Sequence, residues 1–399
     1  MEKRHAHVAF VLSLFDTGLG AIRSLGRAGI PVVGLDFDPR NAGFASRYCS
    51  ARRCPDPIQQ PRELVHLLLT EGRRLDEPGI LFPASDAFVL FCSRYRNELG
   101  RYFRFALPSA DILEAVVNKR RQYEMAERVG TPYPATCYPE TVGDVQRIKD
   151  HLDYPVFIKP CYGHLWRVKF GGTHKGFKVQ GPEELAARFE EILPTGLRVM
   201  VQSIITGPNT NHFKVNAYIS ATGEPLAVFT LRKIRQYPTE FGVGTLVESV
   251  RHPALAELGL QFFRGIGYRG MGSIEFKKDE RDGKLKMIEL NPRLWQQNAH
   301  ATACGINFPL VQYLDLTGQA PEPQVEFVEG VKWLDATADF QAFWAYFRRR
   351  ELTPWAWLRS WRGSRAFATF AWDDLGPFLR ANDYGLKYLR LPLYLLRHR

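Results

Sequence analysis

The stretch Met287-Ile288-Glu289-Leu290-Asn291-Pro292-Arg293 decides the fold, together with Ser273-Ile274-Glu275-Phe276 upstream of it. Both runs alternate apolar and polar residues, which is the pattern of a half-buried β-strand. Side chains two residues apart on a strand point to the same face. Glu289 and Asn291 therefore share a face, and Glu275 joins them if the two strands pair.

Two carboxylates and an amide on one face predict a site for a divalent cation. Mg²⁺ binds a few such oxygens and keeps positions open for phosphate oxygens. Arg293, at the end of the second strand, would form an ion pair with the phosphates. The alternative is a hairpin with an exposed charged face and a polar turn over residues 279–284.

Composition places the chain among globular proteins with anionic ligands. Its 399 residues suggest two or three domains, and its formal net charge is 53 − 42 = +11. That balance favours nucleotide phosphates or carboxylates, and leaves nucleic acid and anionic membrane surfaces open. The six cysteines are scattered with no CxxC pair, so we expect reduced thiols in a cytoplasmic protein. No apolar run is long enough to predict a membrane-spanning helix.

The first hundred residues predict a small α/β domain. Apolar runs at 8–12 and 32–38 flank a predicted helix at 21–28, which makes a βαβ unit of the doubly wound kind. The polar turn 13–20 holds only part of a dinucleotide fingerprint, so it is weak evidence for a dinucleotide cofactor. Asp86 follows another predicted strand, where it would touch a substrate amine or cap the next helix.

Two lysines and a glycine-rich segment in the middle of the chain indicate phosphate chemistry. Lys119 opens a predicted helix, and Lys159 ends the predicted strand 154–160, where it can pair with phosphate as a point charge. The segment 163–176 carries Gly171, Gly172 and Lys175 in what we predict to be a mobile loop closing on phosphates. Its alternative is a solvated hairpin. Cys161 is better explained as a buried thiol than as a nucleophile.

Two further segments fit a nucleotide site. The strand and turn at 197–208 predict a hinge between lobes that offers adenine an apolar slot and backbone hydrogen bonds. The run 232–235 contains three cations beside the glycine-rich turn 241–245, which suits a phosphate or a carboxylate. A solvated basic edge is the alternative for that run.

In order and spacing these segments resemble the ATP-grasp superfamily over about residues 1–315. The chain looks closest to the carboxylate–amine ligase branch, similar to D-aspartate ligase and carbamoyl-phosphate-synthetase-like ATP-grasp proteins. The resemblance implies a mixed α/β and α+β architecture with an N-terminal Rossmann-like pre-ATP-grasp domain (1–110) and an ATP-grasp domain (111–318, with a lid subdomain at about 132–205). Beyond these, the basic and aromatic composition of residues 319–399 predicts a C-terminal extension that forms a helical appendage.

The resemblance also implies a role for each candidate residue. The expected metal ligands are Glu275, Glu289 and Asn291. The expected catalytic cations near the transferred phosphoryl group are Arg293, Arg235 and Lys233. The expected nucleotide-binding residues are Lys119, Lys159, Gly171, Gly172, Lys175, Gln202, Ser203, Ile204 and Ile205. The acid that usually holds the ribose after the hinge glycine is replaced by Pro208-Asn209-Thr210-Asn211.

The expected activity is ATP-dependent joining of a small-molecule carboxylate to an amine through an acyl phosphate, with ATP and Mg²⁺, or Mn²⁺ in its place. The alternatives are an ATP-grasp enzyme that carries out carboxylation or phosphoryl transfer, and a nucleotide-binding, membrane-associated module without turnover. No nucleic-acid partner is expected. The alternating basic and apolar residues at the C-terminus predict at most a weak contact with an anionic membrane surface.

Overall fold

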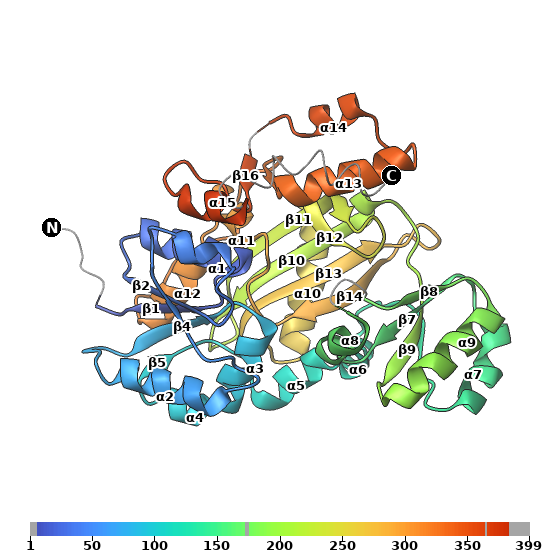
Figure 1. Ribbon diagram of the computed structural model, residues 1–399, viewed down its shortest axis with the longest axis horizontal. Helices are drawn as coiled ribbons and strands as arrows, with labels where there is room; N and C mark the ends of the chain where they lie inside the picture. Colours follow the sequence, from blue (N-terminus) through green and yellow to red (C-terminus); the bar gives the residue numbers. More distant parts are fainter. Residues whose placement is uncertain (1–5, 172–174, 364, 383–399) are drawn as a thin grey trace.

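A computed structural model describes residues 6–171, 175–363 and 365–382 (Figure 1). Its strands form three sheets of five, seven and four strands. Among the described residues, no helix is both long and apolar enough to cross a membrane.

The N-terminal sheet is parallel, with strand order β3-β2-β1-β4-β5. Its strands are β1 (Ala9–Leu12), β2 (Val32–Asp36), β3 (Ser50–Arg53), β4 (Gly79–Pro83) and β5 (Phe103–Arg104). The first, second and fourth were predicted from their apolar runs. The helices of this region are α1 (Asp16–Arg27), α2 (Pro61–Gly72), α3 (Asp86–Arg94), α4 (Arg96–Leu99) and α5 (Ala110–Val117).

The turn predicted at residues 13–20 is wrong, because helix α1 already begins at Asp16. The two glycines of that segment serve close packing. A Cβ on Gly18 would lie 1.8 Å from the backbone oxygen of Ser13, and one on Gly20 would lie 2.3 Å from Asn298 Oδ1. Glycine is needed here because neighbouring atoms come too close for any side chain.

The seven-stranded sheet, in the order β14-β13-β10-β11-β12-β15-β16, forms the centre of the molecule (Figure 1). Its strands are β10 (His212–Ile219), β11 (Pro225–Tyr237), β12 (Val243–Ser249), β13 (Gly270–Lys278), β14 (Leu285–Asn291), β15 (Lys332–Leu334) and β16 (Arg365–Phe367). The helices α6 (Lys119–Val129), α10 (Pro253–Gly265), α11 (Asn298–Ala303) and α12 (Phe308–Leu316) accompany it. Buried residues of β1, α1, β11 and β15 belong to one continuous apolar core, which joins the N-terminal sheet to the central one.

The small sheet is antiparallel, with strand order β6-β9-β7-β8. Its elements are β6 (Thr136–Cys137), α7 (Val142–Ile148), β7 (Val156–Pro160), α8 (Gly163–Phe170), β8 (Phe177–Val179), α9 (Pro182–Ile192) and β9 (Val199–Ser203). The segment 163–176 therefore opens with helix α8, where the sequence predicted a glycine-rich loop. The reason is packing, because buried Trp166 contacts Phe170 with tilted rings and meets Phe177 edge-on.

The C-terminal extension is only partly helical. It supplies α13 (Ala336–Arg348), α14 (Pro354–Ser360) and α15 (Gly376–Ala381), but also strands β15 and β16, which extend the central sheet. The predicted helical appendage is corrected in this respect. Each of these strands has three residues, which is too short for a two-residue periodicity to be recognised. The terminal segment predicted to touch membranes lies outside the described residues.

Candidate functional site

Two glutamates face each other across the β13–β14 pair. In its antiparallel register Glu275 lies opposite Glu289, and Asn291 lies opposite Ser273. The Asn291 amide donates to Glu289 Oε1 at 3.3 Å. The glutamate side chains are 16% and 24% exposed, so a ligand can reach them. The structure thus brings together the three predicted metal ligands.

Each glutamate has a lysine partner. Lys119 Nζ, at the start of α6, donates to Glu289 Oε2 at 2.6 Å. Lys214 Nζ on β10 lies 2.8 Å from Glu275 Oε1, and the two residues are opposite in the β10–β13 register. Lys119 and the other lysines lower the pKa of Glu289, and Lys214 and Lys233 lower that of Glu275 against the opposing effect of burial. Both carboxylates are therefore ionised at neutral pH.

Two more lysines are buried near the glutamates, and within the described ranges neither forms an ion pair with a carboxylate. Lys159 Nζ donates to the Tyr123 hydroxyl at 3.1 Å and to the Ile288 carbonyl at 3.2 Å. Lys233 Nζ donates to Gln236 Oε1 and to the Gly242 carbonyl. Burial lowers the pKa of each lysine to about 7, helped by a neighbouring lysine and opposed by the glutamates. A bound anion would favour their charged forms.

Arg293 connects the central sheet to the N-terminal sheet. Its Nε donates to Asp86 Oδ1 at 2.6 Å, and its Nη1 donates to the Leu294 carbonyl. Asp86 is the first residue of α3, and Ser85 occupies the N-cap position. The N-cap position predicted for Asp86 is occupied by Ser85, and the Asp86 carboxylate accepts a hydrogen bond from the arginine. This contact sets the guanidinium at the carboxyl end of β4, where open α/β sheets place ligands.

The predicted adenine hinge follows strand β9. Gln202 and Ser203 end the strand, and Gln202 Nε2 donates to Thr136 Oγ1 at 2.9 Å. The carbonyl oxygens of Ile204 and Ile205 accept hydrogen bonds from Arg281 and Lys277. The hinge backbone is therefore held by the β13–β14 hairpin that also carries the glutamates. Each carbonyl oxygen has a second lone pair to offer a ligand.

Arg235 is not brought to the glutamates, although the sequence predicted a catalytic role for it. Its guanidinium makes a bidentate ion pair with Asp339 of α13 at 2.7 and 2.8 Å and is 5% exposed. A register irregularity lies between Lys233 and Arg235 in the β11–β12 pair. Such a bulge re-aims the following side chain, and this separates the two basic residues. We leave Arg235 out of the candidate site for this reason.

The remaining predicted residues lie in the segment after α8. Gly171 has a φ of +87°, a conformation that favours glycine. Lys175 is exposed. Gly172 lies outside the described residues.

Cys161 is 3% exposed, and burial raises the pKa of its thiol to about 11, which agrees with the prediction of a packing role.

The residues present fit a magnesium–nucleotide pair better than an isolated metal ion. No group of three or more His, Cys, Asp or Glu side chains gathers for a metal anywhere in the described ranges. Two carboxylates and one amide supply few oxygens, so a cation here needs further oxygens from its ligand, as Mg²⁺ takes from phosphates. The buried Lys159 and Lys233 would neutralise the charge of those phosphates.

Lys214 and Tyr123 belong to the site but were missed in the sequence. A signal for Lys214 exists, because His212, Lys214 and Asn216 alternate with apolar residues on one strand. His212 is half-buried, with its Nε2 3.8 Å from Glu275 Oε2. Only the pairing of β10 with β13 shows that these side chains face the glutamates.

Comparison with known proteins agrees with this geometry. No protein-family model matches the chain. It is 26% identical over 269 residues to D-aspartate ligase of Enterococcus faecium, covering 64% of this chain and 62% of that ligase's length. A solved ADP complex of N5-carboxyaminoimidazole ribonucleotide synthetase is similar in fold, with a TM-score of 0.62, 12% identity and coverage of 81% and 79%.

A third similar protein is the L-amino acid ligase of Bacillus licheniformis. Its crystal structure aligns with a TM-score of 0.59 and 15% identity, and the alignment covers 82% of this chain and 76% of that one. The three sheets, the opposed glutamates and these likenesses in sequence and fold agree. In sequence and in fold, the chain is similar to ligases and synthetases of the ATP-grasp kind.

Proposed function

We propose that this protein is an ATP-dependent carboxylate–amine ligase that forms an amide through an acyl phosphate and releases ADP and phosphate. The observation that carries the proposal is the pair Glu275–Glu289, held in register and surrounded by buried cations. The sequence likeness to D-aspartate ligase supports the class of bond. The substrates are a small-molecule carboxylate and an amine.

The nucleotide would lie between the small sheet and the β13–β14 hairpin. Adenine would meet the hinge at Gln202, Ser203, Ile204 and Ile205, while Lys119 and Lys159 would contact the phosphates. Glu275, Glu289 and Asn291 would hold Mg²⁺, or Mn²⁺ in its place. A bound cation of this kind would neutralise the negative charge of the phosphates while the phosphoryl group is transferred. Gly171, Gly172 and Lys175 would approach the phosphates from the segment after α8.

The chain's own residues would act by positioning and by charge. Arg293, fixed by Asp86, would orient the substrate carboxylate toward the γ-phosphorus. Lys233 would stabilise negative charge that develops on the transferred phosphoryl group. The carboxylate oxygen bonds to phosphorus as ADP leaves, and the amine then attacks the acyl carbon as phosphate leaves. Because no covalent bond to the enzyme is required, the buried Cys161 thiol has no chemical part.

An isotope experiment tests this proposal directly. Purified protein is given MgATP and a panel of ¹⁸O-labelled carboxylates, first with candidate amines and then with hydroxylamine, which traps acyl phosphates as hydroxamates. We expect ADP release that depends on a carboxylate, transfer of one ¹⁸O to phosphate, and hydroxamate formation. Glu289→Gln serves as the inactive control.

Three other outcomes would contradict the ligase assignment. ADP release supported by bicarbonate and an amine, without another carboxylate, would indicate carboxylation. Transfer of phosphate to a stable product without loss of the label would indicate a phosphotransferase. Tight MgATP binding without turnover for any pair would indicate a nucleotide-binding module.

A further inference from the structure

Helix α14 has two chemically different faces. Trp357 and Trp361, four residues apart, each donate an indole N–H to Asp339 Oδ2 at 2.8 Å. Asp339 is fully buried and also accepts from Arg235 and Thr245. These contacts fix α14 against α13 and the central sheet. One face of the helix is therefore anchored inward, and its orientation is set by a buried carboxylate.

The opposite side of α14 is open to solvent. Trp355 is 66% exposed and Leu358 is 51% exposed. Arg359 and Arg362 are also exposed. Positions 355, 358 and 359 are spaced so that they lie on one side of the helix, and Arg362, just after the helix, joins them because its guanidinium lies over the Trp355 ring. We call these four residues the outer face of α14. In Figure 1, α14 lies at the margin of the molecule, beyond α13.

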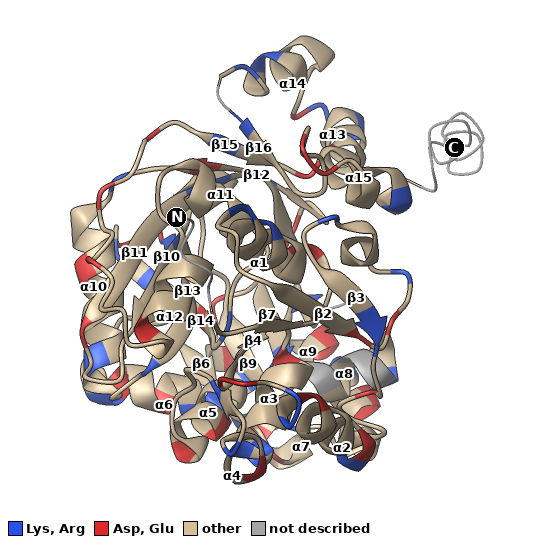
Figure 2. Ribbon diagram, turned by 90° about the vertical axis from the view of Figure 1, so that its left-hand side faces the viewer, with Lys and Arg blue, Asp and Glu red and all other residues tan. Residues whose placement is uncertain are grey.

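The charge around this face has a single sign. Between residues 340 and 365 the sequence contains six arginines and one acid, Glu351. Exposed Arg349 and Arg350 follow α13, next to Phe347, which is 41% exposed. Figure 2 shows basic segments on both α13 and α14. Arg349, Arg350, Arg359 and Arg362 form no ion pair with a carboxylate within the part of the chain that the structure describes.

We propose that the outer face of α14 docks on the surface of an anionic lipid bilayer. Tryptophan suits the interface between headgroups and acyl chains, because one edge is polar and the rest apolar. The arginines complement anionic headgroups. They would reach the bilayer together with the aromatic residues, because Arg362 already lies over the Trp355 ring at 5.7 Å. Docking is peripheral, since no described helix can cross a membrane. The anchored inner face means that little order is lost on binding.

Vesicle co-sedimentation of the full chain tests the proposal. Phosphatidylcholine vesicles with and without phosphatidylglycerol are compared at low and high salt, and tryptophan emission is recorded in parallel. We expect binding only to the anionic vesicles, a blue shift of the emission, and weakening by salt. Arg359→Glu with Arg362→Glu should lower the partition coefficient at least about tenfold, and Trp355→Ala with Leu358→Ala should remove the blue shift.

Matched controls separate this surface from general charge or hydrophobicity. Arg73→Glu with Arg101→Glu changes net charge equally on the exposed surface of the N-terminal region, and Ile58→Ala removes an apolar side chain that is 69% exposed. These should bind vesicles like the unaltered protein. Equal binding by the α14 variants would overturn the proposal, as would absence of binding to anionic vesicles. A dimer in light scattering that dissociates only in the Trp355→Ala, Leu358→Ala variant would also overturn it, by assigning the face to a second copy.

Discussion

At the scale of single residues, the Glu275–Glu289 pair carries the proposed chemistry. Both carboxylates are kept ionised by lysines that the fold brings from β10 and α6. Two further lysines are buried and form no ion pair with a carboxylate in the described part of the chain, so the site has an excess of positive charge that phosphates would neutralise. Glu289 is the most informative residue to change, because it meets Lys119, Asn291 and the opposite glutamate.

Glu289→Gln should lower ATP turnover by at least about 100-fold, because one carboxylate of the proposed cation site is lost. The amide keeps the size of the side chain, so we expect the far-ultraviolet circular dichroism to be unchanged. Glu280→Gln, an exposed change in the turn of the same hairpin, should keep the original turnover. Equal ADP release by the two variants would exclude Glu289 from the site.

Asp16, at the start of α1, predicts an unusual pH dependence of stability. Burial raises its pKa to about 6, with a contribution from Asp335 and against a hydrogen bond from Gln296. The folded state then holds a proton more tightly than the unfolded state, so stability decreases as pH rises from about 4 to about 6. Asp16→Asn should remove this decrease.

The expected gain for Asp16→Asn is about 1–2 kcal/mol in the free energy of unfolding above pH 6, and close to none near pH 4. Urea denaturation at both pH values measures it. Asp111→Asn, an exposed acid in the first turn of α5, is the control. A variant that is equally destabilised at both pH values would show that Asp16 is ionised throughout.

At the scale of secondary-structure elements, α13 and α14 are attached to the central sheet through one carboxylate. Asp339 accepts from Arg235, Thr245, Trp357 and Trp361. This contact lies two residues from Lys233 along β11, so the extension and the candidate site share a strand. The extension is therefore integrated in the sheet that carries the site.

Asp339→Ala should cost about 3–5 kcal/mol, because Arg235 is left as a buried, unpaired charge. Arg235→Met should cost a similar amount. The double change Arg235→Met, Asp339→Leu should be less destabilising than either single change, since it buries no charge. Chemical denaturation of the three variants gives the comparison. Strictly additive losses would mean that the two residues do not act as a pair.

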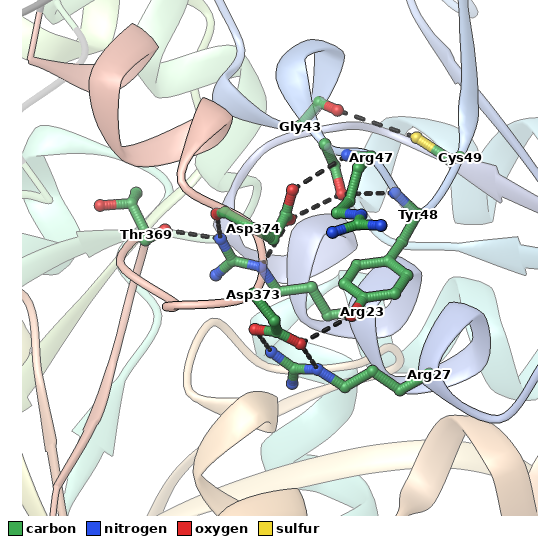
Figure 3. Close-up of polar contacts among 10 residues, drawn as sticks. Arg23, Arg27, Gly43, Arg47, Tyr48, Cys49, Thr369, Asp373 and Asp374 are labelled. Carbon is green, nitrogen blue, oxygen red and sulfur yellow. Dashed lines mark hydrogen bonds and ion pairs between the residues drawn. The ribbon is translucent and has the colours of Figure 1, made fainter.

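At the scale of the whole molecule, the extension also fastens the N-terminal region to the rest (Figure 3). Asp374 accepts from Arg23 Nε, the Ser46 hydroxyl and the Arg47 backbone N–H, and is buried. Its neighbour Asp373 accepts from Arg27 and Tyr48 at the surface. Strands β15 and β16 join the central sheet, so the same segment contacts both regions.

The two adjacent aspartates provide an internal comparison of buried and exposed ion pairs. Asp374→Ala should cost about 3 kcal/mol or more, because Arg23 stays buried with 5% of its side chain exposed. Asp373→Ala should cost no more than about 1 kcal/mol, because the Arg27 pair is more than two-fifths exposed on both sides. Thermal unfolding of both variants measures the two losses of stability. An equal loss in the two variants would contradict the expected difference between buried and exposed pairs.

Local pattern was sufficient to predict much of the central sheet. The alternation around Glu275 and Glu289 identified β13, β14 and the turn between them, because a half-buried strand repeats every two residues. Lys159 at the end of β7 and the packing role of Cys161 follow from equally local features. Helix α8 was missed because its aromatic contacts with β8 outweigh the glycines around it.

The sequence by itself determined the longer strands, β13 and β14 among them, and which polar residues share a face on them. Only the tertiary structure decided that Lys214 meets Glu275, that Arg235 pairs with Asp339, that Asp86 holds Arg293, and that β15 and β16 extend the central sheet. Each of these depends on residues distant in the chain, joined by strand register or by one side chain crossing between elements. The periodicity of a segment shows which of its residues lie on the buried face and which on the exposed face. It carries no information on which other element packs against that face.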